Sequence, residues 1–173
     1  MKQSIVNVKA SEFIADNYLR PKHLNILDFD VYEPSVFFNN GRLESLISLQ
    51  LDRLRINDDH ITALSNSPYL TNLRWLDLAA NDISIAGVEA ICKGVQANRL
   101  PNLAWLELLG TQCDVTPYLD GYHWRMTQTA SELSTRYGIH KWMTLGKMGA
   151  EGEHYELLSQ KQRNNIPPNR FLI

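Results

Sequence analysis

Three groups of acidic and histidine side chains are the part of this sequence that could carry out chemistry. The run Asp58-Asp59-His60 and the pair Asp28 and Asp30 have the residue types that bind metal ions or activate water. A third group near the C-terminus could hold a cation and consists of Glu151, Glu153, His154 and Glu156. The sequence contains no HExxH, GxSxG, P-loop or dinucleotide-binding motif that would assign a reaction to any of these groups.

Each group also has a simpler structural interpretation. Asp58 to His60 fall where we expect a turn, and Asp28 and Asp30 have the spacing of alternate residues on an exposed strand face. The C-terminal group surrounds glycines and is typical of a solvated loop. We therefore expect no enzymatic activity, no metal and no cofactor. The alternative is a small enzyme or metal-binding protein that uses the C-terminal Glu and His residues.

Length and composition predict one ordinary globular domain. The chain has 173 residues, 44% of them hydrophobic and 21% charged, which is enough to bury a core without metals or disulfides. Its 17 Lys and Arg against 19 Asp and Glu give a formal charge of −2, without the basic excess of nucleic-acid-binding proteins. We expect neither DNA nor RNA as a partner.

Nothing in the sequence predicts contact with a membrane or an oxidising compartment. No apolar run approaches the roughly 18 residues of a membrane span, and the first residues lack the apolar core of a secretory signal. The two cysteines, Cys92 and Cys113, are too few and too far apart for a disulfide framework or a CxxC motif. We expect a cytoplasmic protein with two buried, reduced thiols.

The informative feature is a repeated leucine pattern. Its clearest copy has apolar residues at positions one, four, six and eleven and an amide at position nine: Leu73, Leu76, Leu78, Ile83 and Asn81. Copies with the same apolar positions start at Leu103 and at Leu51, with Thr111 and Asp59 in place of the amide. A weaker first copy starts at Leu24, with Leu27 and Phe29 in its core positions. Three clear copies are unlikely by chance, so the pattern must reflect the fold.

Strand geometry explains the pattern. Alternate residues of a strand point to opposite faces, so Leu76 and Leu78 enter a core while Trp75 and Asp77 face outward. The segment from Ile85 to Val95 has an apolar stripe at helical spacing that can pack behind the strands. Neither element buries its apolar face alone, whereas stacked copies do. The amide at position nine can bond the backbone of the turn after each strand.

This pattern resembles the leucine-rich-repeat family, and the segment after Asn81, with Gly87 near its helix start, is similar to repeats of the ribonuclease-inhibitor type. The resemblance implies an α/β solenoid with a curved parallel sheet on its concave side and helices or irregular segments on its convex side. It also implies protein binding, which can inhibit an enzyme by masking its active site. The irregular copies and small size further resemble bacterial leucine-rich-repeat effectors, which implies delivery into a host cell by a specialised secretion system.

We expect a single domain over residues 1–173, divided into four parts. Residues 1–23 form an N-terminal cap with a helix at Ser11 to Leu19, and residues 24–114 form the repeats. Residues 115–158 form a C-terminal cap with one long helix from Thr116 to Gly138 and a last strand at Ile139 to Leu145. Residues 159–173 are polar and basic, and we expect a flexible tail.

The outward face of the strands is the predicted binding site. Positions three, five and seven of the copies place two tryptophans side by side on neighbouring strands, with charged residues around them. Tryptophan and arginine dominate binding hot spots, so we expect a partner protein here. The predicted partner-binding residues are Arg53, Arg55, Trp75, Asp77, Trp105, Glu107 and Leu109. In the first copy the same positions are Ile26, Asp28 and Asp30.

Overall fold

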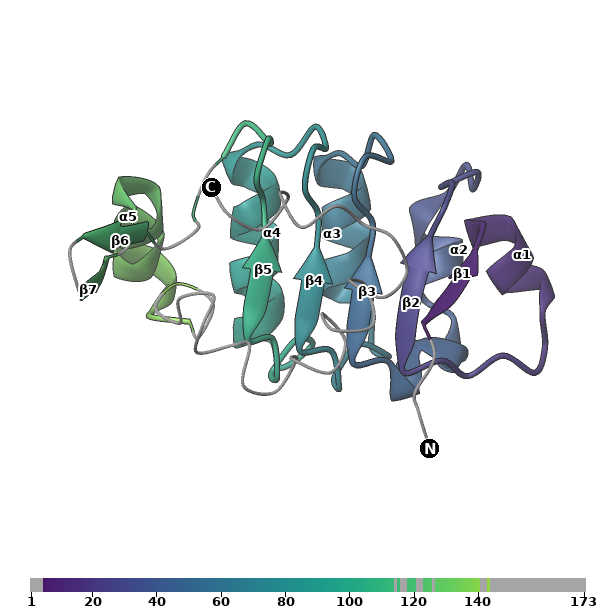
Figure 1. Ribbon diagram of the computed structural model, residues 1–173. Coiled ribbons are helices and arrows are strands. Elements are labelled where there is room, and N and C mark those ends of the chain that lie inside the picture. Colours follow the sequence, from purple (N-terminus) through teal and green to yellow (C-terminus); the bar gives the residue numbers. More distant parts are fainter. Residues whose placement is uncertain are drawn as a thin grey trace.

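A computed structural model describes residues 5–113, 115, 118–120, 123–125, 127–140 and 143 of the chain. It has an α/β fold with a five-stranded parallel sheet in which each strand pairs with the next one along the chain (Figure 1). The strands are β1 (Val6–Val8), β2 (His23–Ile26), β3 (Ser48–Gln50), β4 (Trp75–Asp77) and β5 (Trp105–Glu107). The prediction of an α/β fold with a parallel sheet is therefore confirmed.

Helices connect the strands and cover one face of the sheet. They are α1 (Ala10–Ala15), α2 (Pro34–Phe38), the 3-10 helix η1 (Gly41–Ser45), α3 (Asp58–Asn66), α4 (Ile85–Gln96) and, beyond the sheet, α5 (Gln128–Tyr137). Figure 1 shows α3 and α4 next to each other behind β3, β4 and β5. The opposite face of the sheet has no described helix.

A row of leucines fixes the register of the sheet. Leu24 on β2 pairs with Leu49 on β3, Leu49 with Leu76 on β4, and Leu76 with Leu106 on β5. All four side chains are buried in one core with the helical residues Ile61, Leu64, Val88, Ile91 and Cys92. Burial of this continuous apolar row holds the helices against the sheet.

The predicted register is correct at β4 and β5 and wrong at the two strands before them. Strand β3 lies at Ser48–Gln50, so the leucine that aligns with Leu76 is Leu49 and not Leu54. Two sets of leucines fit the repeat here, and both contain Leu51. The earlier set, Leu46, Leu49 and Leu51, is entirely buried, whereas Leu54 of the later set is only partly buried. This shift of five residues moves Arg53 and Arg55 out of the strand and into the turn that follows it.

The first predicted copy has the same kind of error. We expected Leu27 in the core and Ile26 outside, but Leu27 is 59% exposed and Ile26 is 2% exposed. Strand β2 is placed by the pairing of Leu24 with Leu49, which makes Leu24 a central core residue. Asp28 and Asp30 therefore follow the strand and do not lie on its outward face.

The turns after three strands share one backbone conformation. Arg53, Ala80 and Gly110 occupy equivalent places and have φ angles of 61°, 54° and 76°. The amide of Arg53 donates to the carbonyl of Ala79 at 3.0 Å, and the amide of Ala80 donates to that of Leu109 at 2.8 Å. Positive φ is unfavourable for residues with a Cβ, so neighbouring turns must stabilise Arg53 and Ala80 in it.

Asn81 connects the turns after β3 and β4 in the way predicted for an amide at position nine. Its Oδ1 accepts from the backbone N–H groups of Leu54 and Ile56 at 3.0 and 2.9 Å. Its Nδ2 donates to the carbonyls of Leu51 and Leu78 at 2.7 and 2.9 Å. One buried side chain thus satisfies backbone groups of two consecutive turns.

The N-terminal segment contributes a strand that we did not predict. Val6, Asn7 and Val8 pair with β2 and extend the sheet by one strand. The helix that follows, α1, ends at Ala15 and is shorter than the predicted helix, which reached Leu19. Asp16 ends it, because its carboxylate accepts hydrogen bonds from the amides of Tyr18 and Leu19, which turn away from the helix.

The C-terminal segment also differs from the prediction. In place of one helix from Thr116, the chain forms an antiparallel hairpin of β6 (Tyr118–Asp120) and β7 (His123–Arg125), followed by α5. Gly121, which follows Asp120 at the end of β6, favours a hairpin turn. Gly138 ends α5 with a φ of 82°, as expected for a C-cap. Of residues 139–145, those described are Ile139, His140 and Met143, and none of the three is in a strand.

Helices α3 and α4 approach so closely that a glycine is required between them. A Cβ added at Gly94 would lie 2.8 Å from the backbone oxygen of Ser65. We predict that Gly94→Ala lowers the free energy of unfolding by about 1 to 3 kcal/mol, because backbone must move. In an open helix, replacing glycine by alanine instead raises the free energy of unfolding, by roughly 0.5 to 1 kcal/mol.

Urea unfolding of Gly94→Ala measures this effect, with Gly41→Ala as the control. A Cβ at Gly41 meets the Tyr69 ring at 3.6 Å, an ordinary contact, so its stability should stay near that of the wild type. Equal or higher stability of Gly94→Ala would contradict the close approach of α3 to α4.

Cys92 and Cys113 are both buried, and they form no disulfide with each other. Burial raises the pKa of Cys92 to about 12, with a smaller contribution from the negative charge of Glu89. The thiol of Cys92 is therefore unreactive at neutral pH. Within the described part of the chain, no helix combines the length and the apolar character needed to cross a bilayer.

Candidate functional site

The sheet face opposite the helices carries two rows of side chains in register. The first row runs across four strands and consists of His23, Ser48, Trp75 and Trp105. His23 Nδ1 and Ser48 Oγ are hydrogen-bonded at 3.0 Å. The indole rings of Trp75 and Trp105 are stacked, with centroids 5.2 Å apart and planes inclined by 25°. The row thus changes from polar to aromatic along the sheet.

The second row lies two residues further along each strand and consists of Asn7, Asn25, Gln50, Asp77 and Glu107. Asn25 Nδ2 donates to Asn7 Oδ1 at 2.8 Å, so amides bond each other at the β1 end. At the β5 end, Asp77 accepts from the amide of Ala79 and Glu107 from that of Leu109, each at 3.1 Å. The aromatic pair and the carboxylate pair therefore share β4 and β5.

The tryptophans lie on the predicted face, but their predicted exposure is wrong. Trp75 is 9% exposed and Trp105 is 2% exposed. The Nε1 of Trp105 is buried, and it has no hydrogen-bond acceptor among the described residues. A partner on this face would meet the half-buried Asp77 and Glu107, and Leu109, which is 65% exposed.

The structure does not bring every predicted site residue to this face. Arg53 and Arg55 are exposed in the turn after β3, at the edge of the sheet where the strands end. His23, Asn25, Ser48 and Gln50 take the places on the face that the wrong register had assigned to other residues. The sequence contains one signal for the observed register of β3: Leu46, Leu49 and Leu51 also have the leucine spacing of the repeat.

Among the described residues, two of the acidic side chains that could carry out chemistry make hydrogen bonds within the fold. Asp58 does not lie in a turn but begins α3, and its carboxylate accepts from the amide and hydroxyl of Ser84 at 3.0 and 2.6 Å. Asp30 accepts in the same way from the amide and hydroxyl of Ser11 at 2.9 and 2.6 Å, and these bonds lower the pKa of its carboxyl. His60 begins the same helix, where its amide donates to Asn57.

Metal binding has no candidate site in the residues that the structure describes, since no three His, Cys, Asp or Glu side chains there come together. The C-terminal group of Glu151, Glu153, His154 and Glu156 lies outside the described residues.

The His23–Ser48 pair is a possible nucleophile and base by residue type alone. Burial lowers the pKa of His23, and the positive charge of Lys22 lowers it further, so the imidazole is neutral at neutral pH. Both side chains are nearly inaccessible, however, at 4% and 1% exposed. Because a substrate cannot reach the hydroxyl, we interpret the pair as a bond between strands β2 and β3.

The first row is buried, so the accessible part of this face at β4 and β5 consists of the half-buried carboxylates of Asp77 and Glu107 and the exposed Leu109. No family model matches this chain, and no curated protein matches its sequence.

Proposed function

We propose that the chain is a leucine-rich-repeat solenoid. Support comes from the pairing of each strand with the next along the chain and from the row of aligned core leucines, Leu24, Leu49, Leu76 and Leu106. The shared conformation of the turns and the bonds of Asn81 support the same interpretation. Stacked strand–helix units of this kind form extended surfaces that suit binding.

We propose that the protein binds another protein through the sheet face. The observation that carries this proposal is the continuous second row, which ends in Asp77 and Glu107 beside the exposed Leu109. Two adjacent carboxylates steer a basic surface toward the sheet, and the exposed Leu109, whose amide donates to Glu107, supplies apolar contact. The sheet-face site is defined as Asn25, Asp77, Glu107 and Leu109, which are half-buried or exposed. A protein bound there acts as a ligand, or as an enzyme whose active site is masked.

The test is the double variant Asp77→Asn/Glu107→Gln. It keeps the acceptor oxygens that bind the amides of Ala79 and Leu109, but it removes two negative charges. We expect a folded protein, slower association with the partner and about ten-fold weaker binding, because two charge interactions are lost. The partner is first identified by cross-linking and pull-down, and its binding is then measured by titration at two salt concentrations.

The matched control is Asp59→Asn/Glu132→Gln, which removes two exposed carboxylates from α3 and α5. Binding of this control should equal that of the wild type. If Asp77→Asn/Glu107→Gln binds normally, or if the interface maps only to the helices, the sheet face is not the binding site.

A further inference from the structure

The tryptophan pair of the sheet face is buried more deeply than the described residues explain. Trp75 and Trp105 form a hydrophobic cluster of their own, which contains no other buried residue of the described chain. Trp105 lies on β5, which has a neighbouring strand on one side only in the described sheet, and yet it is 2% exposed. One stacked indole covers one face of a ring, so another part of the chain must cover the rest of Trp105.

The segment that follows Met143 can reach the tryptophan pair. Met143 lies in the same core as Leu133 of α5, and Gln96 of α4 donates to the carbonyl of Tyr137 of α5 at 3.0 Å. Figure 1 shows α4 behind β5, so the segment begins near the β5 end of the sheet. An extended chain rises about 3.3 Å per residue and neighbouring strands are about 4.8 Å apart, so residues 159–173 are within reach of β4 and β5.

Charge favours contact between residues 159–173 and the sheet face. This segment contains Lys161, Arg163 and Arg170 and no Asp or Glu. At β4 and β5 the sheet face carries the carboxylates of Asp77 and Glu107, which are aligned on neighbouring strands and half-buried. A basic segment and a pair of adjacent carboxylates attract each other.

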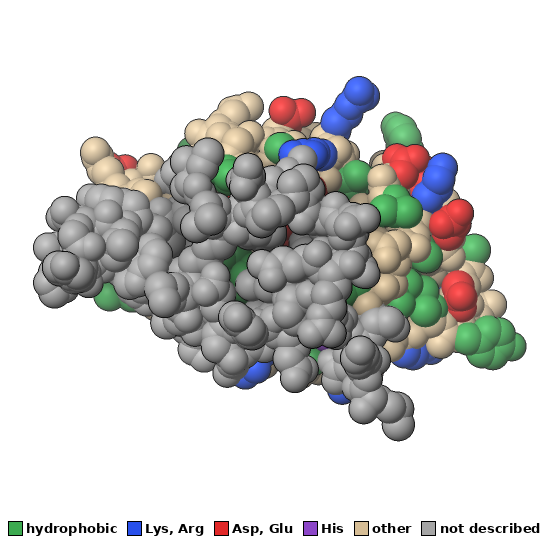
Figure 2. All heavy atoms as spheres, in the orientation of Figure 1, with side chains coloured by type: hydrophobic (Ala, Val, Ile, Leu, Met, Phe, Trp, Pro, Cys, Tyr) green, Lys and Arg blue, Asp and Glu red, His purple; other side chains and the backbone are tan. Residues whose placement is uncertain are grey.

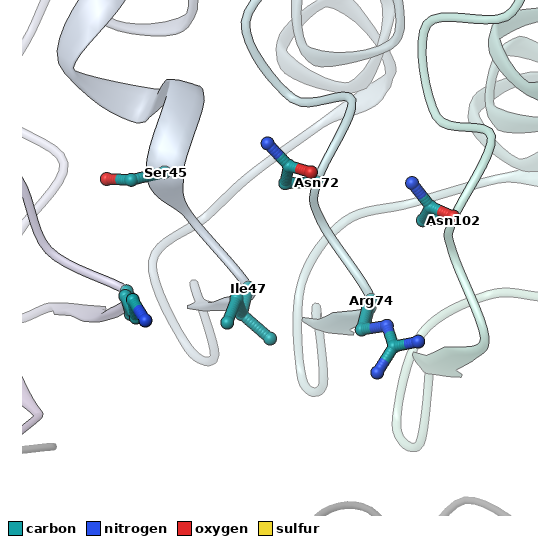
Figure 3. Close-up of a pocket in the computed structure, with 6 residues that line it drawn as sticks. Ser45, Ile47, Asn72, Arg74 and Asn102 are labelled. Carbon is teal, nitrogen blue, oxygen red and sulfur yellow. The ribbon is translucent and has the colours of Figure 1, made fainter.

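Other described surfaces fit a basic segment less well. A trough of about 500 Å³ lies at the edge of the sheet where the strands begin (Figure 3), but its described lining includes two cations and no acidic residue. Over the N-terminal end of the molecule, seen from the side of the sheet face, Lys and Arg side chains lie among Asp and Glu side chains (Figure 2). The described lining of the trough is Lys22, Ser45, Ile47, Asn72, Arg74 and Asn102.

We propose that residues 159–173 bind to the sheet face of their own chain and cover the tryptophan pair. Alternate residues of an extended segment point to the same side, about 6.6 Å apart, so Lys161 and Arg163 both face the sheet. Their long side chains reach the carboxylates of Asp77 and Glu107, whose strands are about 4.8 Å apart. The sequence alone predicted a flexible tail here, and the charges of the sheet face give that tail a place to bind.

The link to the rest of the chain makes a weak contact sufficient. A segment tethered close to its site acts at an effective concentration on the order of millimolar, so two ion pairs and apolar contact from residues 166–168, Ile-Pro-Pro, can hold it. A partner that uses the sheet-face site must displace this segment. That regulatory consequence rests on the proposed function, whereas the binding of the segment itself does not.

The experiment measures the accessibility of Trp75 and Trp105 in the full chain by hydroxyl-radical oxidation, located by mass spectrometry. Lys161→Glu/Arg163→Glu turns both attractions into repulsions, so both tryptophans should be oxidised several-fold faster than in the wild type. Added salt should raise the oxidation rate of the wild type, because it screens the ion pairs.

The matched control is Lys93→Glu/Arg99→Glu, which reverses two exposed cations in and after α4 and should be oxidised like the wild type. Asp77→Asn/Glu107→Gln removes the carboxylates and should expose the tryptophans as well. Adding the reversal of the segment's two cations to that variant should have little further effect, since both changes remove the same interaction.

Equal oxidation of the two tryptophans in the wild type and in Lys161→Glu/Arg163→Glu, with both proteins folded by thermal unfolding, would overturn the proposal. If the variant is not folded, Lys161→Gln/Arg163→Gln replaces it, with faster oxidation again expected. Protection that disappears on dilution would also overturn the proposal, because the cover would then be a second copy of the chain. The expected oxidation rates without capture of any partner protein would support the binding of the segment and count against the proposed function.

Discussion

Leu76→Asp is expected to leave the protein unfolded at room temperature. Leu76 is fully buried between Leu49 and Leu106, on an inner strand of the leucine row. A carboxylate there would lie in the core without a counter-charge, which costs several kcal/mol. Because a domain of this size has a total stability of roughly 5 to 15 kcal/mol, this single change removes a large part of it or all of it. Far-ultraviolet circular dichroism and size-exclusion chromatography measure the outcome.

The same substitution at an exposed leucine separates burial from residue type. Leu109→Asp places a carboxylate at a side chain that is 65% exposed, so its unfolding curve should stay close to that of the wild type. Leu76→Ala, which adds no charge, should cost about 2 to 5 kcal/mol through the cavity that it leaves. A soluble Leu76→Asp protein with an unchanged melting curve would disprove the register of β4.

Asn81→Ala is expected to have the second largest effect. The variant leaves the buried amide of Ile56 and the carbonyls of Leu51 and Leu78 without their side-chain partner. Each unsatisfied buried group costs about 1 to 3 kcal/mol, reduced where water can enter, so we expect a total loss of about 3 kcal/mol or more. Urea unfolding measures the loss, and hydrogen exchange should show the amides of Leu54 and Ile56 exchanging faster.

Asn72→Ala is the control for this prediction, because it removes an amide with one exposed bond, to the carbonyl of Glu44. Its cost should be about 1 kcal/mol or less. If the two alanine variants were equally stable, the amide of Asn81 would not be what holds the two turns together.

Leucine spacing predicted the fold best where only one register fits. Around β4 and β5, the residues Leu76, Leu78, Leu106 and Leu108 have no competing set, and all four are buried. At β3, Leu51 belongs to two overlapping patterns, and the choice depends on which leucines face the helices. That choice is made by packing in a core that Leu49 shares with Leu24 and Leu76 of the neighbouring strands, which are distant from it in sequence.

The C-terminal cap shows a different limit. Apolar residues at helical spacing between Thr116 and Tyr137 fit a helix, but the Asp120-Gly121 pair favours a hairpin. The structure has the hairpin first and the helix only from Gln128. A local turn preference therefore outweighed a periodic pattern.

For the candidate site, strand alternation correctly predicted the face on which Trp75, Asp77, Trp105 and Glu107 lie. It missed Asn25 and Gln50, because these residues reach the face only in the observed register of β2 and β3. Alternation also cannot predict the burial of the tryptophans, since it assigns a direction to a side chain and contains no information about what packs against it.

The stacked tryptophans give the molecule a built-in optical reporter. Two indoles 5.2 Å apart and nearly parallel couple their electronic transitions, so the pair absorbs polarised light as one chiral chromophore. The sign and size of its circular dichroism depend on the angle between the rings, and that angle is set by the pairing of β4 with β5. A slip of one residue between these strands would turn one ring to the other face and abolish the coupled signal. The alignment of the sheet can thus be followed by its spectrum alone, without a label, as the protein folds or binds.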